Sequence, residues 1–574
     1  MTQALGYPAA NAVLAIVALS LVYLAYRWAL PRPLPGIPFD ESARRSLFGS
    51  LPEIQAHIRK TGRLRTWIAA HPTRHNSALT QIWMGPLSKP ALVLADFQES
   101  QDILLRRNKE FDRAQRSADI FAGPIGNHHI GMTSSDPRFK GNKELVRDLM
   151  TPNFLHEVSA PQIYAKTMTL IDLWTLKAGV AQGRPFNARR DIFDAAIDII
   201  NAVTFGLDDD LSTVKKQLDT LMSIQNLEAA PVAADGSIKF PELPEMPDIA
   251  AINAVGDHVG DLFKSIYPIM YHRYKVLTNR KLAENIARKD RLIHAEIDKA
   301  VVRLRDGDSE TRSAMDHILQ REINAAAKSG REPVFHSPRI HDELFGYIVG
   351  GHDTSSTALA WMVKNIANHQ EVQTKLRTAL RSAYAAAHAE GRQPSVVELW
   401  KTPVPYLDAV LEESLRVDGP VPINLRESKV DTYLLGHEIP KGTSVFIVGN
   451  GPGFQSPSLP VPDSVRSETS RAKHSYGSWD PADMHLFKPE RWMKTGEDGK
   501  EVYDAHAGPM LAFSLGPRGC FGRRLAYLET RIVLAMLVWN FEFHQLSDEL
   551  SSHAAYDKIT TNPKYCYVGL SKAK

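Results

Sequence analysis

The sequence predicts a mainly helical domain with a small sheet, an α+β arrangement, preceded by one N-terminal transmembrane helix. Three observations lead to this prediction: long stretches of helical periodicity, two short β-like runs, and a charge-free apolar segment near the N-terminus. Hydrophobic residues make up 43% and charged residues 23% of the 574 residues, as in globular proteins. The net charge of +3 is too small to indicate a nucleic-acid partner, so we expect none.

The segment 8–26, PAANAVLAIVALSLVYLAY, has no formal charge and is long enough to cross a hydrocarbon layer of roughly 30 Å. Arg27 and Arg32 follow it and no basic residue precedes it, so the positive-inside rule places the N-terminus across the membrane and the body in the cytosol. A cleaved signal peptide is the alternative, but the basic start and small-residue cleavage site of such peptides are not evident.

These features divide the chain into three expected parts. Residues 1–30 form a membrane anchor in contact with membrane lipid, and residues 31–38 form a proline-rich hinge that is stiff and extended. Residues 39–574 form one large domain.

Within this domain, some segments show helical periodicity and others are short β-like runs. Helices are expected at 161–178, 252–275, 281–306, 340–369, 371–389, 404–417 and 522–539. Strands are expected at 91–96 and 443–449. Residues 231–248 and the Ser- and Pro-rich stretch 453–475 read as surface loops, and the sequence gives the second loop no role.

Cysteine is scarce: Cys520 and Cys566 are the only two, neither lies in a CxxC pair, and a reducing compartment is indicated. Cys520 stands in FSLGPRGCFG, where glycines permit tight turns with amides facing the sulfur and Arg518 adds positive charge. With a helix starting at about Phe521 or Gly522, these features are expected to lower the thiol pKa. The alternative is a small buried hydrophobe, the commoner role for a lone cysteine.

The pattern Phe-x-x-Gly-x-Arg-x-Cys-x-Gly is matched in full, at Phe513, Gly516, Arg518, Cys520 and Gly522. In this the sequence resembles the haem-binding signature of the cytochrome P-450 family. The resemblance implies a haem-thiolate catalytic domain with the cytochrome P-450 fold, in which Cys520 is the axial ligand of the haem iron. It also implies that Arg518 faces a haem propionate and that Phe513 packs near the sulfur.

A second motif, GGHDTSS, lies inside the expected helix 340–369. Two glycines cost a helix interior roughly 1 kcal/mol each, so on its own the pair marks a break or a close helix contact. The family resemblance gives Gly350 and Gly351 another role, to leave room for dioxygen above the iron. It implies that Asp353 and Thr354 are catalytic and relay protons there.

The pair Glu413 and Arg416 stands three residues apart on one helical face, before a proline-rich turn. The same spacing recurs at residues 41 and 44, 110 and 113, 144 and 147, and 468 and 471, so spacing alone is weak. In the family such a pair joins the arginine of a later motif, here Arg491 of FKPERW, in a buried network that fixes the cysteine loop. Arg426 of PINLRES stands where the family often has another propionate-binding arginine.

Two further segments of the sequence do not match the family pattern fully or match no motif. The family pattern Trp-x-x-x-Arg falls on Lys143 and Arg147, so Arg147 is expected to bind a propionate, and whether Lys143 replaces the tryptophan stays open. His128 and His129 of GNHHIG have no further ligands at suitable spacing, which favours surface residues, and we assign them no function.

The resemblance implies a membrane-anchored haem-thiolate monooxygenase, similar to microsomal fungal members, that inserts one oxygen atom of O2 into a hydrophobic organic substrate. No dinucleotide fingerprint is evident, so electrons are expected from an NADPH-dependent flavoprotein reductase in the endoplasmic reticulum membrane. Phe345, Ile348 and Val349 indicate a hydrophobic substrate, and specialised metabolism and fatty-acid or sterol oxidation are both compatible.

Two alternatives remain open. Some relatives are isomerases or dehydratases that need no O2, which the retained Asp353 and Thr354 argue against. The other is a non-catalytic anchored scaffold in which Cys520 is structural.

Overall fold

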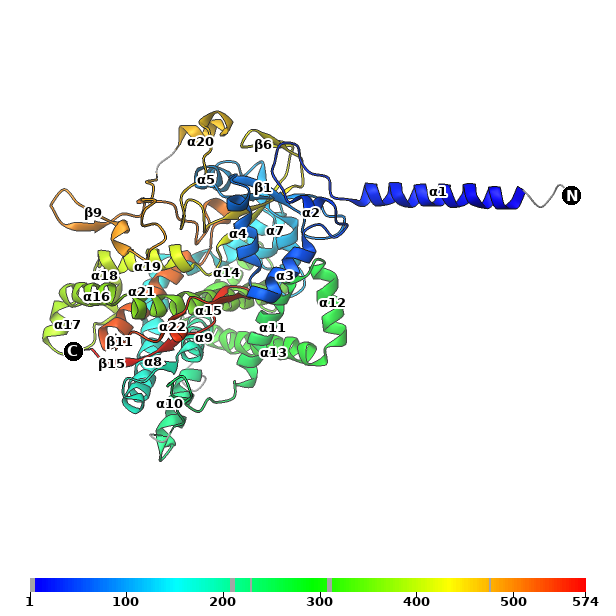
Figure 1. Cartoon of the computed structure of the whole chain (residues 1–574). Coiled ribbons are helices and arrows are strands. Elements are labelled where there is room, and N and C mark those ends of the chain that lie inside the picture. The colour runs from blue at the N-terminus through cyan, green and yellow to red at the C-terminus, as the bar shows by residue number, and fades with distance from the viewer. Residues whose placement is uncertain (1–5, 207–211, 228–229, 307–311, 474–475, 574) are drawn as a thin grey trace.

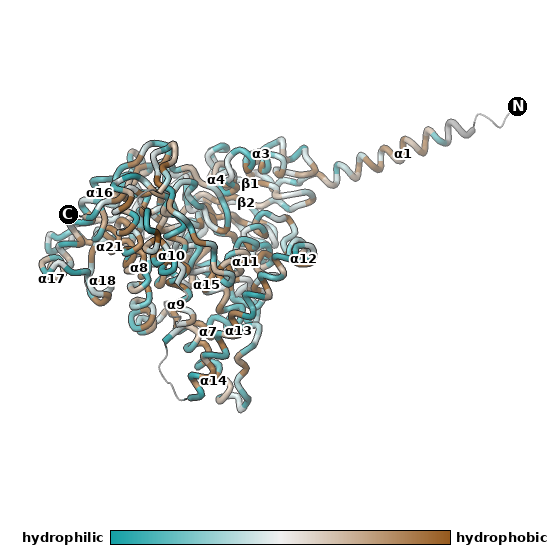
Figure 2. Tube along the Cα trace, turned by 90° about the horizontal axis from the view of Figure 1, so that it is seen from below, coloured by the Kyte–Doolittle hydropathy of each residue, from teal (hydrophilic) through white to brown (hydrophobic). Residues whose placement is uncertain are grey.

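The computed structural model describes residues 6–206, 212–227, 230–306, 312–473 and 476–573 (Figure 1). A large helical body carries small sheets, and helix α1 (Gly6–Ala29) projects away from it (Figures 1 and 2). In this described part of the chain, one helix is long and apolar enough to cross a membrane: Asn11–Ala29, with a mean hydropathy of 1.8 and none of it buried. The predicted fold class, mainly α with a small β part after one apolar helix, is confirmed.

The proline-rich segment after α1 is fastened to the body. The backbone N–H of Leu34 donates to Oε1 of Gln81 at 2.8 Å, and Nε2 of Gln81 donates to the carbonyls of Leu34 and Ile37 at 2.9 and 2.7 Å. Gln81 belongs to strand β1 (Leu79–Ile82), so these bonds fix the segment to the main sheet. A separate hinge at 31–38 stays a prediction.

The helices of the body differ in length, and the long ones build the core. The longer helices are α3 (Leu51–Thr61), α4 (Leu64–Arg74), α5 (Phe97–Leu105), α7 (Pro137–Val146), α8 (Ala160–Ala181), α9 (Arg189–Phe205), α10 (Thr213–Ser223), α11 (Pro247–Lys264), α12 (Pro268–Thr278), α13 (Arg280–Arg305), α14 (Ala314–Lys328), α15 (Pro338–Asn368), α16 (Gln370–Ala383), α19 (Pro405–Asp418) and α21 (Arg523–Asn540). Shorter ones are α2 (Glu41–Arg44), α6 (Gln115–Phe121), α17 (Ala385–Ala389), α18 (Val396–Lys401), α20 (Glu468–Ala472) and α22 (Asp548–Ser551).

Helix α15 is the central helix of the core. Ser337 caps it by accepting a hydrogen bond from the N–H of Ile340, and Pro338 occupies its first turn. It packs along α9 and also contacts α19 and α21. The approach to α9 is close at Gly351, where a Cβ would lie 2.5 Å from Cδ1 of Ile200.

The main sheet has five strands in the order β1-β2-β8-β5-β3. These are β1 (Leu79–Ile82), β2 (Ala91–Leu94), β8 (Ser444–Val448), β5 (Ile423–Ser428) and β3 (Phe111–Arg113), and only β2 and β8 run parallel. The expected strands at 91–96 and 443–449 are thus β2 and β8. The register places Arg113 of β3 opposite Arg426 of β5.

Five two-stranded sheets complete the β structure. They are formed by β6 (Thr432–Leu434) with β7 (His437–Ile439), β9 (Met493–Thr495) with β10 (Glu501–Tyr503), β11 (Phe541–Phe543) with β15 (Leu570–Lys572), β12 (Ala555–Asp557) with β13 (Thr561–Pro563), and β4 (Phe186–Asn187) with β14 (Tyr567–Val568).

The structure refines the sequence predictions at two places. The expected helix 252–275 is interrupted at residues 265–267, and 371–389 is interrupted at Tyr384. The loop 453–475, of which residues 474 and 475 lie outside the described part, packs on α5 because Arg466 forms ion pairs with Asp96 at 2.6 and 2.8 Å.

Candidate functional site

A cavity of about 530 Å³ lies between α15, the main sheet and the segment that contains Cys520. Apolar side chains form much of its wall, among them Ile120, Phe121, Val259, Phe263, Phe345 and Val349. Cys520 lines it, as do Phe513, Arg518 and Gly522 of the same motif. The cavity therefore places a thiol at the edge of a largely apolar space.

The cysteine loop is held by its own backbone. The N–H of Cys520 donates to the carbonyl of Phe513 at 2.8 Å, and that of Gly519 donates to Gly516 at 2.9 Å. Gly516 has a φ of +70°, and a Cβ there would lie 2.0 Å from the carbonyl oxygen of Leu104, so only glycine fits. A Cβ at Gly522 would meet nothing within 4 Å, so this glycine leaves the cavity open beside the cysteine.

The expectation that the protein groups around Cys520 lower the pKa of its thiol is wrong. The Cys520 side chain is accessible from the cavity, but the protein around it desolvates the thiol, which raises its pKa and outweighs the opposing effects of the Gly522 amide and the Arg523 guanidinium. The cation beside the sulfur is Arg523, because Arg518 instead donates to the carbonyl of Met132 at 2.8 Å. A coordinated metal ion would remove this proton, since a coordinating thiol is deprotonated by the metal.

Three buried guanidinium groups gather at the cavity wall, on Arg113, Arg426 and Arg518. Burial together with the charges of Arg518 and Arg426 lowers the pKa of Arg113 to about 9. Burial and the neighbouring charge lower the pKa of Arg426 to about 10, and burial lowers that of Arg518 to about 10. Asp112 is the carboxylate near them, and it also accepts hydrogen bonds from Ser134.

The cluster leaves donors unused. Nε of Arg113 and Nη1 of Arg518 are buried and have no hydrogen-bond partner in the described structure. Buried donors and excess positive charge are costly unless an anion meets them. The cluster fits an anionic group that enters the cavity, and two carboxylates of a haem would satisfy it.

Arg113 was missed by the sequence analysis. It stands in a short strand, in FDRAQ, and matches no motif. Its place becomes apparent only from the register that sets it opposite Arg426.

Arg147 does not contribute to the cavity in this structure. Its side chain is 64% exposed and pairs with Glu144 at 3.0 Å. Helix α7 ends at Val146 and a 3-10 turn follows, which turns Arg147 outward, whereas Lys143 lines the cavity and donates to the carbonyl of Pro517 at 3.2 Å. The structure therefore gives no support to a propionate role for Arg147.

The two glycines of α15 have different surroundings. Gly350 lines the cavity, and a Cβ there would meet nothing within 4 Å, whereas Gly351 also allows the close contact with α9 described above. The Thr354 hydroxyl borders the cavity and donates to the carbonyl of Gly350 at 2.8 Å. Asp353 is not among the lining residues, and its carboxylate accepts a hydrogen bond from Thr560 at 3.0 Å.

Another acid, Glu529 of α21, does line the cavity. Burial raises its pKa to about 8, although Ser355 donates to Oε2 at 2.8 Å. Sequence analysis missed it, but one signal was present: Glu529 interrupts the apolar face of LAYLETRIVL that Leu525 and Ile532 mark.

His128 and His129 are not surface residues, which corrects the expectation. Their side chains are 7% and 12% exposed and lie against Glu343, whose Oε2 is 2.8 Å from Nδ1 of His129 and 3.4 Å from Nε2 of His128. Gly346 gives His128 room, because a Cβ there would lie 2.2 Å from its ring. Asn142 also donates to Glu343, so this cluster satisfies its own hydrogen bonds.

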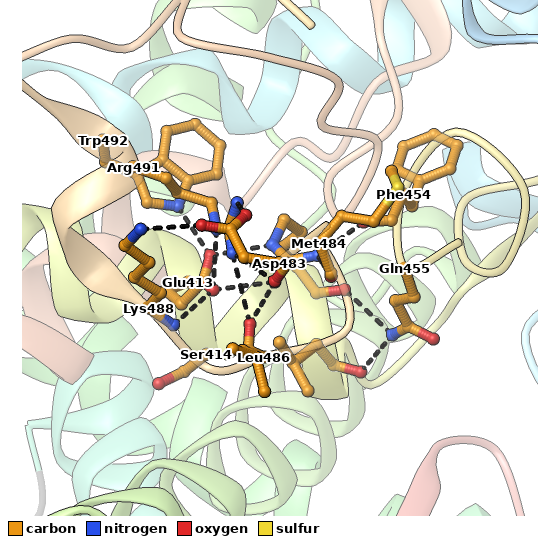
Figure 3. Close-up of polar contacts among 12 residues, drawn as sticks. Glu413, Ser414, Phe454, Gln455, Asp483, Met484, Leu486, Lys488, Arg491 and Trp492 are labelled. Atoms are coloured by element: carbon orange, nitrogen blue, oxygen red, sulfur yellow. Dashed lines mark hydrogen bonds and ion pairs between the residues drawn. The ribbon is translucent and has the colours of Figure 1, made fainter. Parts of the chain in front are cut away.

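Glu413, Arg416 and Arg491 do form one buried network. Figure 3 shows Glu413 with Arg491 and Trp492. Nε and Nη2 of Arg416 each donate to Glu413 at 2.7 Å, and Nε of Arg491 donates to Oε1 of Glu413 at 3.1 Å. Trp492 donates to Glu413 as well, at 2.9 Å. Arg416 further donates to the carbonyls of Met484 and Leu486, so α19 is joined to the segment that leads to the cysteine loop.

Comparison with known proteins agrees with this architecture. The sequence model of the family described as cytochrome P450 matches residues 73–451 and 479–568. The match omits residues 452–478, which include the whole of the loop 453–475 that packs on α5.

Several fungal proteins are similar over nearly their full length. Cytochrome P450 monooxygenase TRI13 of Fusarium sporotrichioides is 35% identical over 96% of this chain and 97% of its own. Cytochrome P450 monooxygenase xilC of Penicillium rubens is 35% identical over 95% and 93%, and GME11363 of Pestalotiopsis microspora, also named a cytochrome P450 monooxygenase, is 32% identical over 97% of both. The chain therefore belongs to the cytochrome P450 family and is a monooxygenase of that family.

Proposed function

We propose that this protein is a membrane-anchored haem-thiolate monooxygenase that inserts one oxygen atom of O2 into a hydrophobic organic substrate, by hydroxylation or epoxidation. One observation carries the proposal: the Cys520 thiol and three arginines, two of which have an unused donor, border the same apolar cavity. A thiolate-ligated haem would use this combination, a sulfur ligand for iron and cations for two carboxylates.

The haem would be held by Cys520, whose sulfur would ligate the iron, and by Arg113, Arg426 and Arg518, which would bind its carboxylates, with Lys143 at the same cavity wall. When bound, the haem supplies oxygen activation and the transfer of one oxygen atom to the substrate. The protein binds and orients both molecules. Its cavity wall excludes water, because the side chains that surround the space are largely apolar.

Proton supply is assigned to Thr354 and Asp353. The Thr354 hydroxyl, held by the Gly350 carbonyl, presents its oxygen to the cavity. Burial raises the pKa of Asp353, so this carboxyl retains its proton above the ordinary range and can pass it on. Asp353 lies behind the wall, so its proton would reach the cavity through water.

The substrate would be a hydrophobic organic molecule. Phe345 and Val349 line the cavity as the sequence predicts, whereas Ile348 is packed in the core. Similarity to fungal monooxygenases along the whole chain favours a step of specialised metabolism.

The same proposal places the protein in the endoplasmic reticulum membrane, with the N-terminus lumenal, the catalytic domain cytosolic and α1 as its anchor. Helix α1 supports this, since its apolar segment extends free of the body (Figure 2). Electrons would come from an NADPH-dependent flavoprotein reductase.

The carbon monoxide difference spectrum of the reduced full-length protein tests the haem assignment. We expect a thiolate-ligated haem spectrum in the wild type and in Cys566→Ala, and none in Cys520→Ala. Cys566 is the matched control, because it is buried away from the cavity. A thiolate spectrum that persists in Cys520→Ala would rule out the assignment.

A further inference from the structure

Three histidines meet on the outside of the body, away from the cavity. They are His294 of α13, His336 in the linker between α14 and α15, and His341 in the first turns of α15. One ring nitrogen from each lies within 4.8 Å of the others. The ring centroids are 4.1 Å apart for His294 and His341, and 4.6 Å apart for His294 and His336. Three separate elements thus bring imidazoles to one point.

The inner histidine has an unused nitrogen. His341 is 9% exposed, and its Nε2 is buried without a hydrogen-bond partner in the described part of the chain. A buried ring nitrogen of this kind is costly unless a ligand meets it. His294 and His336 are exposed, so an ion could enter from solvent.

Two other histidine groups of the described structure have hydrogen-bond partners for their ring nitrogens. His128 and His129 direct ring nitrogens to Glu343, and Nε2 of His258 and Nδ1 of His272 are joined by a hydrogen bond of 3.0 Å. In those two groups, the ring nitrogens that point into the group are therefore paired. In the described structure, no hydrogen bond joins the imidazoles of His294, His336 and His341.

A carboxylate stands behind the cluster. Asp298 lies one helical turn after His294 on α13, and its Oδ1 is 2.8 Å from Nε2 of His336. Metal-binding histidines commonly direct their second nitrogen to a carboxylate, which fixes the orientation of the ring and increases the basicity of the ligand. His336 is held in this way.

We propose that His294, His336 and His341 bind one Zn²⁺ ion. Imidazole nitrogen is a preferred zinc ligand, and three histidines with a fourth position for water complete a tetrahedral set. The ion joins α13, the α14–α15 linker and the start of α15. His341 precedes Gly350 by nine residues, or about 13 Å of helix, so the site fixes the end of the helix that forms the cavity wall without entering the cavity.

Zinc binding to the haem-loaded full-length protein tests the proposal. After removal of loosely bound metal, Zn²⁺ is titrated against a chromophoric chelator, and X-ray absorption at the zinc edge reports the donor atoms. We expect one ion per chain with three nitrogen donors. His336→Ala should abolish this binding, and Asp298→Asn should weaken it about 10- to 100-fold. Because both side chains are exposed, these variants should fold.

His485→Ala is the matched control, an exposed histidine outside the cluster, and should bind zinc as the wild type does. Zinc should also raise the melting temperature of the wild type and leave that of His336→Ala unchanged. Equal zinc affinity in the wild type and in His336→Ala would overturn the proposal, because the ion would then lie elsewhere. An absorption spectrum without three nitrogen donors would overturn it too.

Discussion

Arg113 and Arg426 lie directly opposite each other on β3 and β5, although both are cations. Like charges at opposite positions of a strand pair are destabilising, and here a third cation, Arg518, adds to the repulsion. Such an arrangement persists where an anion compensates it. The pair therefore identifies the edge of the cavity at which the carboxylates of the cofactor belong.

Arg113→Gln should weaken haem retention. Losing a charge-assisted hydrogen bond costs about 1.5 to 3 kcal/mol, so haem should dissociate roughly 10- to 100-fold faster. Transfer of haem to apomyoglobin measures this rate. Arg147→Gln is the control and should match the wild type, because Arg147 is exposed. The reverse result, fast loss only in Arg147→Gln, would contradict the arrangement of the cavity.

Two Glu–Arg pairs with the same three-residue spacing should differ sharply in their effect on stability. Glu413 and Arg416 have fully buried side chains, so Glu413→Gln leaves a buried charge unpaired and should cost about 3 to 5 kcal/mol of unfolding free energy. The pair Glu41 and Arg44 is more than half exposed, and Glu41→Gln should cost less than about 1 kcal/mol. Denaturant unfolding compares them. Equal costs would refute a stabilising role for the buried network.

Glu529 should make stability dependent on pH. Its pKa is about 8 in the folded protein, above the ordinary 4.5. Between these values the folded state keeps a proton that the unfolded chain loses, so the contribution is complete below about pH 4.5 and is lost as the pH rises through about 8. The wild type should therefore lose a few kcal/mol relative to Glu529→Gln across this range. Melting temperatures from pH 5 to 9 measure the difference.

Glu549→Gln is the control for this experiment, because Glu549 is exposed on α22. It should follow the wild type at every pH. If the Glu529→Gln profile also runs parallel to that of the wild type, Glu529 is not protonated in the folded protein.

Removal of residues 1–30 tests the anchor. The truncated protein should leave the membrane fraction and retain haem, because the residues that line the cavity all lie beyond residue 57. Sedimentation with membranes and the haem absorption spectrum measure the two properties. Loss of haem with membrane binding unchanged would contradict an anchor separate from the catalytic domain.

The sequence predicted those features that depend on local pattern. Periodicity located α15 and α21, and the motif glycine Gly516 marked a turn that tolerates no side chain. The sequence analysis missed α9. Nearly all residues of this helix are buried, including its aspartates, so it has no polar face that would mark it as a helix.

Features that depend on tertiary contacts could not be predicted from the sequence either. Strand register pairs Arg113 with Arg426, and the turn after α7 directs Arg147 outward. The Cys520 thiol shows the competing effect most clearly: loop chemistry favours a thiolate, but desolvation by the surrounding protein raises the pKa. Desolvation depends on the whole fold, so a local motif does not reveal it.

The last prediction concerns proton delivery and separates the monooxygenase from an isomerase or dehydratase. Thr354→Ala removes the hydroxyl that borders the cavity, so substrate binding and iron reduction should stay largely unchanged while product formed per NADPH consumed falls. A positioned proton donor typically contributes about 10² to 10⁴ fold, and less where ordered water replaces it. Thr354→Ser keeps the hydroxyl and should retain the coupling. Full turnover without O2 or reductase, unchanged in Thr354→Ala, would reject the oxygenase function, because an isomerase or dehydratase needs no proton for oxygen activation.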